Sequence, residues 1–449
     1  MITLISLPSP FLQEPAMNPP LGLCSIGTVI KEAGYKVKVI DFAIKKYNYS
    51  SDEYLYELPL GSKYYGISCV SAQFKWFKEV VRYLNKYSPE SIIIAGGPHV
   101  SSEIESCLDV GVDIAFNGEG EESILDILSG KKWGEIPGVC YDLGGEYLIK
   151  PRVFVEDLNK IPLPDFSLFE IDKYERRLFG EKAFHIMTLR GCPYNCNFCD
   201  SNAIGGAVRY IDEKRIIDWI DTIIEKYKIK NFVIYDDTFT IKSKRVKYFC
   251  KEFKKRGIKW RCWSRANSLR YDDLVAMKDS GLESISIGVE SGSPLILKNI
   301  NKMTTVEHNR KAIEVCKKAG VPVRCSLMFG NPGECGTTLR ETVDFIQETQ
   351  PDEWNISILM PAPGSEFWIN PEKHGLSFDK KKIIEDDYQE LNRSSRSGMG
   401  NINVVIDTMP KHMMINYLDW FVQELERVCP RKTIRDVVQN IKVESLQKD

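Results

Sequence analysis

The sequence lacks several features that would assign it to a class at once. No run of about 18 apolar residues occurs, so no segment is predicted to span a bilayer. The N-terminus, MITLISLPSPF, has neither a basic leader nor a small-residue cleavage site, so we expect no secretory signal. The formal net charge is only −2 and there is no dense basic stretch, so nucleic acid is not expected as a partner. Together these features predict a cytoplasmic protein.

The chain also has few residues that favour disorder. Among 449 residues there are 22 prolines and 31 glycines, while 43% are hydrophobic and 27% charged, which is typical of a packed protein. A single core rarely exceeds roughly 250–300 residues, so the length predicts two or three domains. The 13 cysteines are an odd number. In a reducing compartment they are expected to be metal ligands or buried thiols rather than a disulfide framework.

Residues 1–135 alternate short apolar runs with longer amphipathic stretches. This alternation predicts a Rossmann-like, doubly wound parallel sheet with helices on both faces. Ligands of such sheets bind outside the carboxyl ends of the strands, and the loops there are rich in glycine and proline. Glycine lets the backbone approach a large flat cofactor closely. The expected strands are 1–8, 36–42, 64–70, 91–97 and 113–119, and the helices are 21–34, 74–87, 101–111 and 121–130.

Residues 136–180 are predicted to be a packed linker with a hairpin around Gly144 and Gly145. The strand and helix alternation then resumes over 181–369 and predicts a partial (β/α)6 barrel, with the chemistry at the carboxyl ends of its strands. The expected strands are 183–191, 231–237, 259–266, 284–291, 321–330 and 353–361, and the helices are 212–227, 242–256, 271–280, 305–319 and 336–348.

Three cysteines follow the first strand of this second region. Cys192, Cys196 and Cys199 in CPYNCNFC are separated by three and two residues. Structural zinc normally takes four ligands in two pairs, and no second pair is present; His185 is expected to be a packed residue. Iron and sulfur held by three thiolates, with one corner free of protein ligands, fits better than zinc or a chance group of buried thiols. The cysteines expected to be simply buried are Cys250, Cys262, Cys316 and Cys325.

This motif, with Phe198 before the third cysteine, resembles the defining motif of the radical SAM superfamily. YDDTF, SRAN, GVESGS, FGNPGE and PAPGSEFW also end predicted strands and resemble that superfamily's successive strand-end motifs. The resemblance implies a [4Fe–4S] cluster on the three cysteines that binds S-adenosyl-L-methionine (SAM) at its open iron. The implied SAM contacts are Phe198, Asp236, Asp237, Arg265, Glu290, Gly330 and Pro332. Alternatively, Asp237 caps a helix and Arg265 pairs structurally with Glu290.

The N-terminal region resembles the cobalamin-binding domain that precedes the barrel in cobalamin-dependent radical SAM enzymes. No Asp-x-His-x-x-Gly run occurs, so a histidine ligand to cobalt is not expected, and His99 is expected beside the corrin's tail or phosphate. The alternatives are a domain that has lost the corrin or that binds another partner. The implied cobalamin contacts are Pro20, Leu21, Gly22, Ser71, Gln73, Gly96, Gly97, His99, Gly118, Glu119 and Gly120.

These resemblances imply a C-methyltransferase. A 5′-deoxyadenosyl radical would activate a substrate carbon and methylcobalamin would donate the methyl group, with flavodoxin or ferredoxin as electron donor. Both cofactors would share a water-excluding cavity. Rearrangement, ring contraction or cyclisation without methyl transfer remains open. A methylthiotransferase would need a second cysteine trio, for which Cys24, Cys69 and Cys107 are candidates, but it is disfavoured because Cys24 lies within a helix pattern and Cys69 inside a strand. A non-enzymatic scaffold is disfavoured because the cofactor motifs are intact.

The tail, 370–449, is predicted to be a helical cap with helices at 411–429 and 433–445. Its Ser/Gly loop at 394–400 is either a connection or a lid that brings Tyr388, Arg393 and Arg396 to an anionic or peptide substrate. Met413, Trp420 and Phe421 are candidates for an apolar channel for a lipid. The sequence does not decide between a peptide, lipid, sugar or small-metabolite substrate.

Overall fold

A computed structural model describes residues 1–10, 15–45, 47, 49, 51–178, 180–384 and 402–430. The chain divides into two compact units. The first unit contains Met1–Arg176 and Ala203–Arg209, with the described residues from 380 to 384. The second contains Arg177–Asn202, Tyr210–Asp379 and the described residues from 402 to 430. Each unit is described by itself below.

The first unit contains a seven-stranded sheet in the order β2-β1-β3-β4-β5-β6-β7. Strands β1 to β5 are parallel, and β6 and β7 are antiparallel additions. Its elements are β1 (Ile2–Ser6), α1 (Leu21–Glu32), β2 (Val37–Asp41), β3 (Tyr64–Ser68), α2 (Phe74–Tyr87), β4 (Ile92–Gly96), α3 (Pro98–Ser102), α4 (Ile104–Asp109), β5 (Ile114–Phe116), α5 (Glu121–Leu128), β6 (Val139–Asp142) and β7 (Tyr147–Leu148). The doubly wound sheet predicted from the sequence is confirmed.

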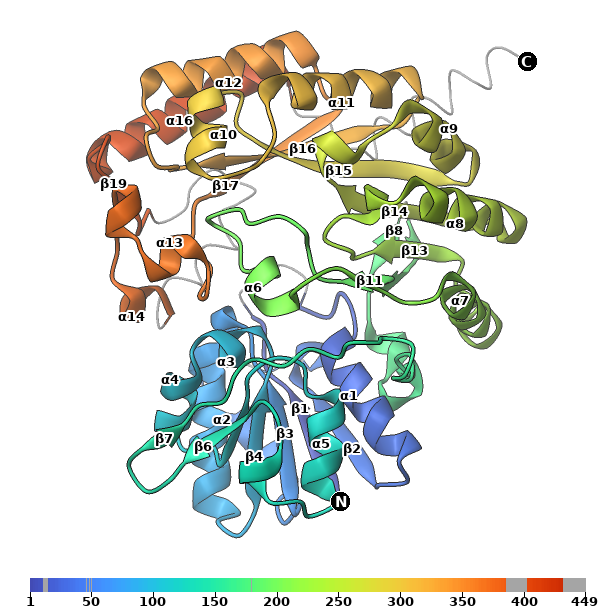
Figure 1. Ribbon diagram of the computed structural model, residues 1–449, viewed down its shortest axis with the longest axis vertical. Coiled ribbons are helices and arrows are strands. Elements are labelled where there is room, and N and C mark those ends of the chain that lie inside the picture. The colour runs from blue at the N-terminus through green and yellow to red at the C-terminus, as the bar shows by residue number, and fades with distance from the viewer. Residues whose placement is uncertain are drawn as a thin grey trace. The chain divides into compact units, whose positions relative to one another are not determined.

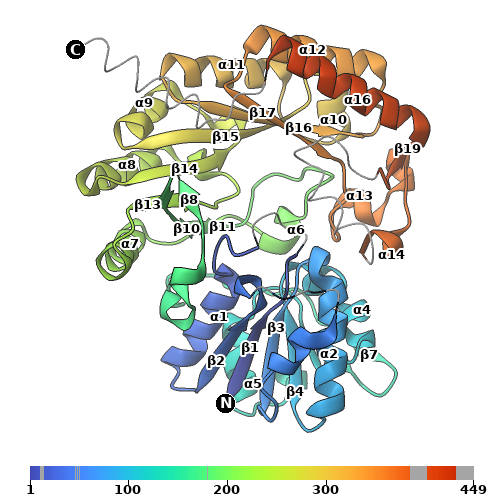
Figure 2. The same cartoon turned by 180° about the vertical axis from the view of Figure 1, so that it is seen from behind.

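Helices cover both faces of this sheet. Helix α1 packs with α5, and these two lie on the opposite side of the sheet from α2 and α4 (Figure 1; Figure 2). The strand β1 is buried along its whole length, which fits an apolar strand covered on both faces. After β1 the chain adds β2 on one side of the sheet and then β3 on the other side, so the strand order changes direction between β1 and β3. Such folds bind ligands at the carboxyl ends of the two strands at this point.

The segment 136–176 belongs to the first unit. The hairpin expected at Gly144 and Gly145 joins β6 to β7, and both glycine N–H groups donate to Asp142 Oδ1, at 2.9 and 2.7 Å. Further along, Val153 forms a parallel bridge with Gly118 at the end of β5. This segment therefore extends the sheet instead of only connecting two domains.

The second unit contains a six-stranded parallel sheet in the order β10-β13-β14-β15-β16-β17, as predicted for a partial barrel. Its principal elements are β10 (Phe184–Ile186), α7 (Glu213–Tyr227), β13 (Asn231–Ile234), α8 (Ser243–Arg256), β14 (Lys259–Ser264), α9 (Tyr271–Asp279), β15 (Leu282–Glu290), α10 (Pro294–Asn299), α11 (Val306–Lys318), β16 (Val323–Phe329), α12 (Gly336–Thr349) and β17 (Glu353–Ile358). Its smaller elements are β8 (Arg177–Leu178), β9 (Glu181–Lys182), β11 (Leu189–Arg190), α13 (Glu366–Ile369), β18 (Leu376–Ser377), β19 (Val405–Ile406) and α16 (Lys411–Val428). The short elements α6 (Ser201–Gly205) and β12 (Arg209–Tyr210) include residues of both units, and α14 (Lys380–Lys382) belongs to the first unit.

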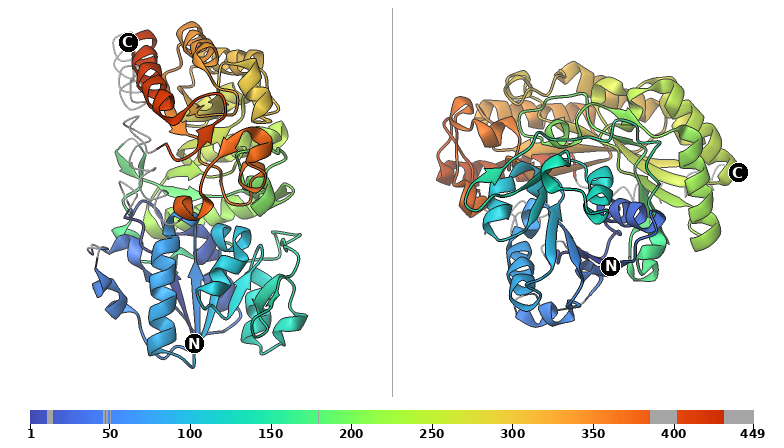
Figure 3. Two further views of the ribbon diagram at one scale, coloured as in Figure 1. Left: turned by 90° about the vertical axis from the view of Figure 1, so that its left-hand side faces the viewer. Right: turned by 60° about the horizontal axis from the view of Figure 1, so that its bottom comes forward.

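The core of the second unit lies between the sheet and its helices, which follow the outer side of the curved sheet (Figure 3). Trp260 of β14 is fully buried, and its ring meets Phe253 of α8 edge-on at 5.4 Å. Trp354 of β17 donates from Nε1 to the carbonyl of Cys429 beyond α16. Alternate residues of these strands therefore point outward and form the hydrophobic core.

The inner face of this sheet is polar. The residues beside Trp260 and Trp354 point the other way, because successive side chains of a strand alternate between faces. The strand register aligns these residues of neighbouring strands side by side. For example, Arg324 pairs with Glu353 at 2.7 Å, and Ser326 donates to Asn355 at 3.2 Å. The described members of this face are His185, Val233, Arg261, Trp263, Ser284, Ser286, Arg324, Ser326, Glu353 and Asn355. A packed barrel interior is dominated by Val, Ile and Leu, and only Val233 is of that kind here.

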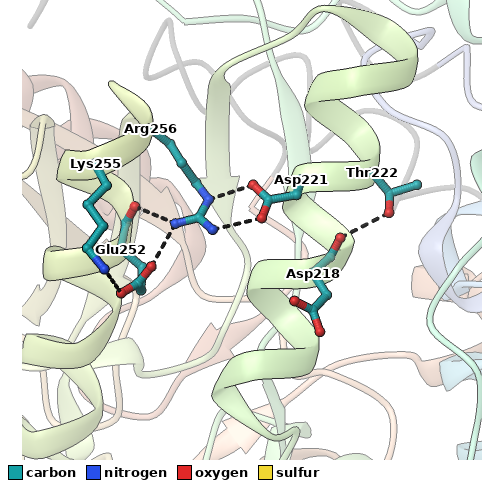
Figure 4. Close-up of polar contacts among 6 residues, drawn as sticks. All are labelled: Asp218, Asp221, Thr222, Glu252, Lys255 and Arg256. Atoms are coloured by element: carbon teal, nitrogen blue, oxygen red, sulfur yellow. Dashed lines mark hydrogen bonds and ion pairs between the residues drawn. The ribbon is translucent and has the colours of Figure 1, made fainter.

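The outer helices are joined by ion pairs that Figure 4 shows for α7 and α8. Arg256 of α8 binds both carboxylate oxygens of Asp221 on α7, at 2.5 and 2.7 Å, and also contacts Glu252 at 2.8 Å. Lys255 pairs with the same Glu252 at 2.6 Å. These residues are partly to largely exposed, so the network is a solvated helix–helix contact and not a site.

The tail contributes one long helix to the second unit. The buried residues of α16 include Met414 and Phe421, and Phe421 lies 6.3 Å from Phe329 between ring centroids. Phe421 is therefore core, which corrects its assignment to an apolar channel, while Met413 is exposed. The expected helix at 433–445, the loop at 394–400 and the lid residues Tyr388, Arg393 and Arg396 lie outside the described residues. In the part of the chain that the structure describes, no helix is long and apolar enough to cross a membrane.

Candidate functional site

The three motif cysteines lie in the loop that follows β10 and β11 at the carboxyl end of the barrel strands. The side chains of Cys192 and Cys196 are 9% and 8% exposed, and Cys199 is partly exposed. Burial is the largest influence on the Cys199 thiol and raises its pKa to about 11. The Cys199 thiol is therefore protonated at neutral pH until a metal displaces the proton.

The donor set suits a cluster better than a single metal ion. All 13 cysteines are free thiols. Within the described residues, no three His, Cys, Asp or Glu side chains converge on one metal ion. Three cysteines around a cubane each bind a different iron, so they need not converge on one point. The Cys199 sulfur accepts the backbone N–H of Ser201 at 3.4 Å, a contact that suits a thiolate.

A short segment that the sequence analysis missed holds this loop in place. Asn197 donates from its backbone N to the Ile300 carbonyl at 3.0 Å and from Nδ2 to the Asn299 carbonyl at 3.0 Å. In return, Asn301 donates from Nδ2 to the Asn195 carbonyl at 2.6 Å. Residues 299–303, which we call the brace, adopt a left-handed backbone at Asn301 and Met303. On another side of the loop, the Phe367 backbone N donates to the Asn197 carbonyl at 2.8 Å.

Asp236 supports the base of the cysteine loop. Its Oδ1 accepts from the Thr188 backbone N at 2.6 Å and from the Leu189 N at 3.3 Å, and its Oδ2 accepts from the Thr188 hydroxyl at 2.5 Å. Burial raises the pKa of this carboxyl to about 6. Both oxygens are thus occupied by the chain just before the loop. This placement differs from the SAM contact predicted for Asp236, because the side chain points at its own neighbouring strand.

Glu290 has a partner that the sequence analysis also missed. It ends β15 with a left-handed backbone (φ +63°) where the strand register shifts, and its Oε1 accepts from Lys302 Nζ at 2.6 Å. The two side chains are 12% and 7% exposed. The ammonium group also lies 5.6 Å from the Phe198 ring centroid. The expected Arg265–Glu290 pair is therefore replaced by a Lys302–Glu290 pair.

Arg265 contacts the cysteine loop itself. Its Nη1 donates to Cys196 Sγ at 3.3 Å, its Nη2 donates to the Lys302 carbonyl, and its guanidinium lies 3.6 Å from the Tyr194 ring centroid. The Lys302 carbonyl belongs to the brace. The arginine expected to hold SAM is therefore occupied with holding the loop.

The loop after β16 is closed on itself. Gly330 has φ +88° and donates its N–H to Glu334 Oε2 at 2.6 Å, and the Pro332 carbonyl accepts from Asn299 Nδ2 at 2.8 Å. Glu334 is 2% exposed, and burial raises its pKa to about 7. Gly330 and Pro332, both predicted to contact adenine through the backbone, are thus hydrogen-bonded within the protein.

Phe198 and Asp237 remain accessible among the predicted SAM contacts. Phe198 is partly exposed, and Asp237 is exposed and accepts from the Ser201 hydroxyl at 3.3 Å. Although part of its surface is exposed, the protein around the carboxyl group partly desolvates it, which raises the Asp237 pKa. The three thiols fit a [4Fe–4S] cluster, and Phe198 and Asp237 are the predicted SAM contacts whose side chains stay at least partly exposed.

In the first unit, the carboxyl ends of β1, β3 and β4 are linked by predicted cobalamin contacts. Gln73 donates from Nε2 to the Leu7 carbonyl at 3.1 Å and to Ser9 Oγ at 2.9 Å, which spans the point between β1 and β3. Ser71 Oγ lies 3.0 Å from Nδ1 of His99. Three of the predicted residues therefore meet at the ligand-binding edge of the sheet.

His99 is 1% exposed, and burial lowers its pKa to about 4, so its imidazole is neutral. Its Nε2 is buried without a hydrogen-bond partner among the described residues. Gly22 and Gly96 carry no side chain at the same edge, and a Cβ at Gly22 would meet no atom within 4 Å. A buried polar atom without a partner among the described residues fits a bound polar group, as expected for a corrin's amide or phosphate periphery.

Other predicted cobalamin contacts have roles within the protein. The N–H of Gly118 donates to Ser101 Oγ at 3.0 Å and that of Glu119 to the Val153 carbonyl at 3.0 Å. Both Glu119 oxygens bind Arg209, at 2.6 and 2.9 Å. The loop after β5 is thus covered by its own chain. Gly97 has φ +102° and packs on Cys69, and a Cβ at Gly120 would meet Phe116. Pro20 and Leu21 form the start of helix α1.

The two regions match two family models. Residues 186–346 match the radical SAM superfamily, and residues 16–128 match the B12 binding domain. An uncharacterized methyltransferase of Pyrococcus horikoshii is 29% identical over 361 residues, 78% of each chain. The anaerobic magnesium-protoporphyrin IX monomethyl ester cyclase of Rubrivivax gelatinosus is 25% identical over 336 residues, 71% of this chain and 60% of that protein.

Among solved structures, the radical SAM methyltransferase TsrM from Kitasatospora setae, with cobalamin and a [4Fe–4S] cluster bound, aligns with a TM-score of 0.69. The alignment covers 84% of this chain and 80% of that one at 16% identity, which shows a shared fold. A radical SAM domain and a B12-binding domain thus occur in one enzyme chain. The chain belongs to the cobalamin-dependent radical SAM family, whose cofactors are a [4Fe–4S] cluster, SAM and cobalamin.

Proposed function

We propose that the protein is a cobalamin-dependent radical SAM methyltransferase that adds a methyl group to a carbon of its substrate. The observation that carries the proposal is that one chain holds both a three-cysteine loop at the barrel strand ends and a B12-type sheet with an open ligand edge. When bound, the cluster with SAM supplies radical activation of a carbon, and cobalamin supplies the methyl group.

The chain's own residues hold and orient these groups. Cys192, Cys196 and Cys199 would ligate the cluster, and Phe198 and Asp237 would contact SAM. At the carboxyl ends of the strands in the first sheet, Ser71, Gln73 and His99 would contact cobalamin, and the neutral His99 would offer Nε2 as a hydrogen-bonding group. None of these contacts requires His99 to ligate the metal.

The substrate is proposed to bind on the inner face of the second sheet. Tyr235 and Trp263 form an aromatic pair there, 4.7 Å between ring centroids, and Arg261 lies 5.4 Å from the Trp263 ring. Polar groups are costly to bury without partners, so this face favours a polar ligand over an apolar one. We therefore propose a polar substrate with an unsaturated part that packs on Tyr235 and Trp263.

The experiment is anaerobic reconstitution with iron, sulfide and hydroxocobalamin, followed by desalting and an absorption spectrum. We expect cluster absorption and corrin bands together, and formation of 5′-deoxyadenosine once SAM and dithionite are added. Cys196→Ala is the matched control for the second readout. A protein that keeps neither chromophore would contradict the proposal.

Cyclisation, ring contraction or rearrangement without net methyl transfer is the second candidate, because the Rubrivivax gelatinosus relative is named a cyclase. SAM labelled with deuterium in its methyl group separates the two candidates. A labelled methyl group in the product supports methyl transfer. An unlabelled product that has lost two hydrogens supports oxidative cyclisation, and an unlabelled isomer of the substrate supports rearrangement. Radical SAM enzymes need an electron donor, and we propose a flavodoxin or ferredoxin in the cytoplasm, where the 13 free thiols would stay reduced.

A further inference from the structure

The guanidinium of Arg265 connects three segments around the cluster loop. Arg265 directly follows β14 and is 6% exposed. One nitrogen donates to the sulfur of Cys196, another donates to the backbone of the brace at Lys302, and the flat group stacks on Tyr194 of the loop. A planar fork of fixed donors suits this arrangement, which the compact ammonium of lysine cannot reproduce.

These contacts leave little of the side chain for a SAM carboxylate. Nη1 and Nη2 both have protein partners, and Nε is buried without a partner among the described residues. We infer that Arg265 is a positioning residue that fixes Cys196 and raises the reduction potential of the cluster. This inference rests on the proposed ligation of the cluster by the three cysteines.

The electrostatic reason is the charge that the cluster gains. One electron from a reductant makes the cluster more negative, so a nearby cation and an N–H···S hydrogen bond stabilise the reduced form. Burial keeps solvent ions from screening this interaction. Lys302, another cation beside the loop, is already paired with Glu290 at 2.6 Å.

The test is a redox titration of the reconstituted full-length protein without SAM, with dithionite as the electron source and electron paramagnetic resonance as the readout. Arg265→Gln removes the charge and the fork, and Arg265→Lys keeps only the charge. Arg270→Gln is the matched control, because that arginine is 53% exposed and does not contact the loop. We expect Arg265→Gln to disfavour reduction at least tenfold, which equals 59 mV for one electron. Arg265→Lys should give a smaller shift in the same direction, and Arg270→Gln none.

Wild-type potentials in both Arg265 variants would overturn the inference. If Arg265→Gln retains no iron, the Arg265→Lys variant decides. A cluster potential lower than that of Arg270→Gln supports the inference, and a potential equal to that of Arg270→Gln overturns it. If Arg265 instead held SAM, its loss would weaken only the SAM-induced change in the spectrum and leave the SAM-free potential unchanged. Failure of the wild-type protein to bind iron would contradict the proposed function itself. Failure of the inference about Arg265 is therefore distinguishable from failure of the proposed function.

Discussion

The carboxyl ends of the parallel strands are shaped in different ways in the two sheets of this protein. At the first sheet the edge is shaped mainly by backbone: Gly97 and Gly118 have positive φ angles, and a Cβ at Gly118 would stand 2.1 Å from the Val153 carbonyl. At the second sheet it is shaped by side chains, through the contacts of Asp236, Arg265 and the Lys302–Glu290 pair.

The difference follows from what each edge has to hold. A large corrin is bound mainly by close approach of backbone and a few polar groups, so glycine is the informative residue. A cluster needs thiolates at fixed positions, so the chain must hold a loop with many buried hydrogen bonds and charges. The first edge should therefore be sensitive to added bulk, and the second to lost side-chain groups.

The largest effect is expected from Cys196→Ala, which removes one ligand from the side-chain-built edge. We expect iron bound after anaerobic reconstitution to fall to background, because a cluster with two protein ligands is not retained. Iron and sulfide assays with the absorption spectrum measure this loss.

Cys316→Ala is the control, since that thiol is buried in α11 away from the loop. Equal iron contents for the two variants would remove the assignment of the cluster to the motif.

The next effect is expected from Lys302→Met, which leaves the Glu290 carboxylate buried without its partner. Breaking a buried pair in this way typically costs about 3–5 kcal/mol. Urea unfolding followed by tryptophan fluorescence measures the loss, and Lys302→Met with Glu290→Gln should recover part of it. Lys254→Met is the matched control, because Lys254 and Asp279 are each 60% exposed and such pairs contribute less than about 1 kcal/mol. Equal costs for Lys302→Met and Lys254→Met would show that the pair is not structurally important.

The sequence predicted the elements of both sheets well because their periodicity is strong. Helix α2 has the predicted bounds, Phe74–Tyr87, since its apolar residues recur on one face. The cysteine loop was located by its spacing alone.

The directions of the strand-end side chains were not predictable. Asp236 and Arg265 lie where expected along the chain, but contacts with Thr188 and Cys196 depend on segments far away in sequence. The brace at 299–303 carries no motif, and its only local signal is the three polar residues Asn299, Asn301 and Lys302 around Ile300, after the apolar residues of α10.

Gly118→Ala tests the backbone-built edge. Its φ of +106° is unfavourable for alanine, and the added Cβ would collide with the Val153 carbonyl. We expect a loss of about 2–4 kcal/mol, together with weaker retention of hydroxocobalamin. Gly130→Ala is the matched control, because Gly130 also has a positive φ (+86°) but open space around its Cβ, so it should lose only about 1 kcal/mol. The difference between the two variants, measured by urea unfolding, isolates the collision.

The smallest effect concerns the pH dependence of the second edge. Glu334 is buried, and its pKa is raised from 4.5 to about 7, so the folded state keeps a proton that the unfolded state has lost between these values. Stability contributed by this group is therefore present at low pH and falls as the pH rises toward 7. Glu334→Gln removes the titration, and we expect the variant to gain about 2 kcal/mol relative to wild type between pH 5 and pH 8. Urea midpoints at four pH values measure this gain, and Glu353→Gln, whose carboxyl pairs with Arg324, serves as the comparison. If the urea midpoints of wild type and Glu334→Gln change with pH in the same way, Glu334 is already charged in the folded protein. The strand ends of the second sheet would then hold a buried charge, and they would be more polar than the comparison of the two sheets implies.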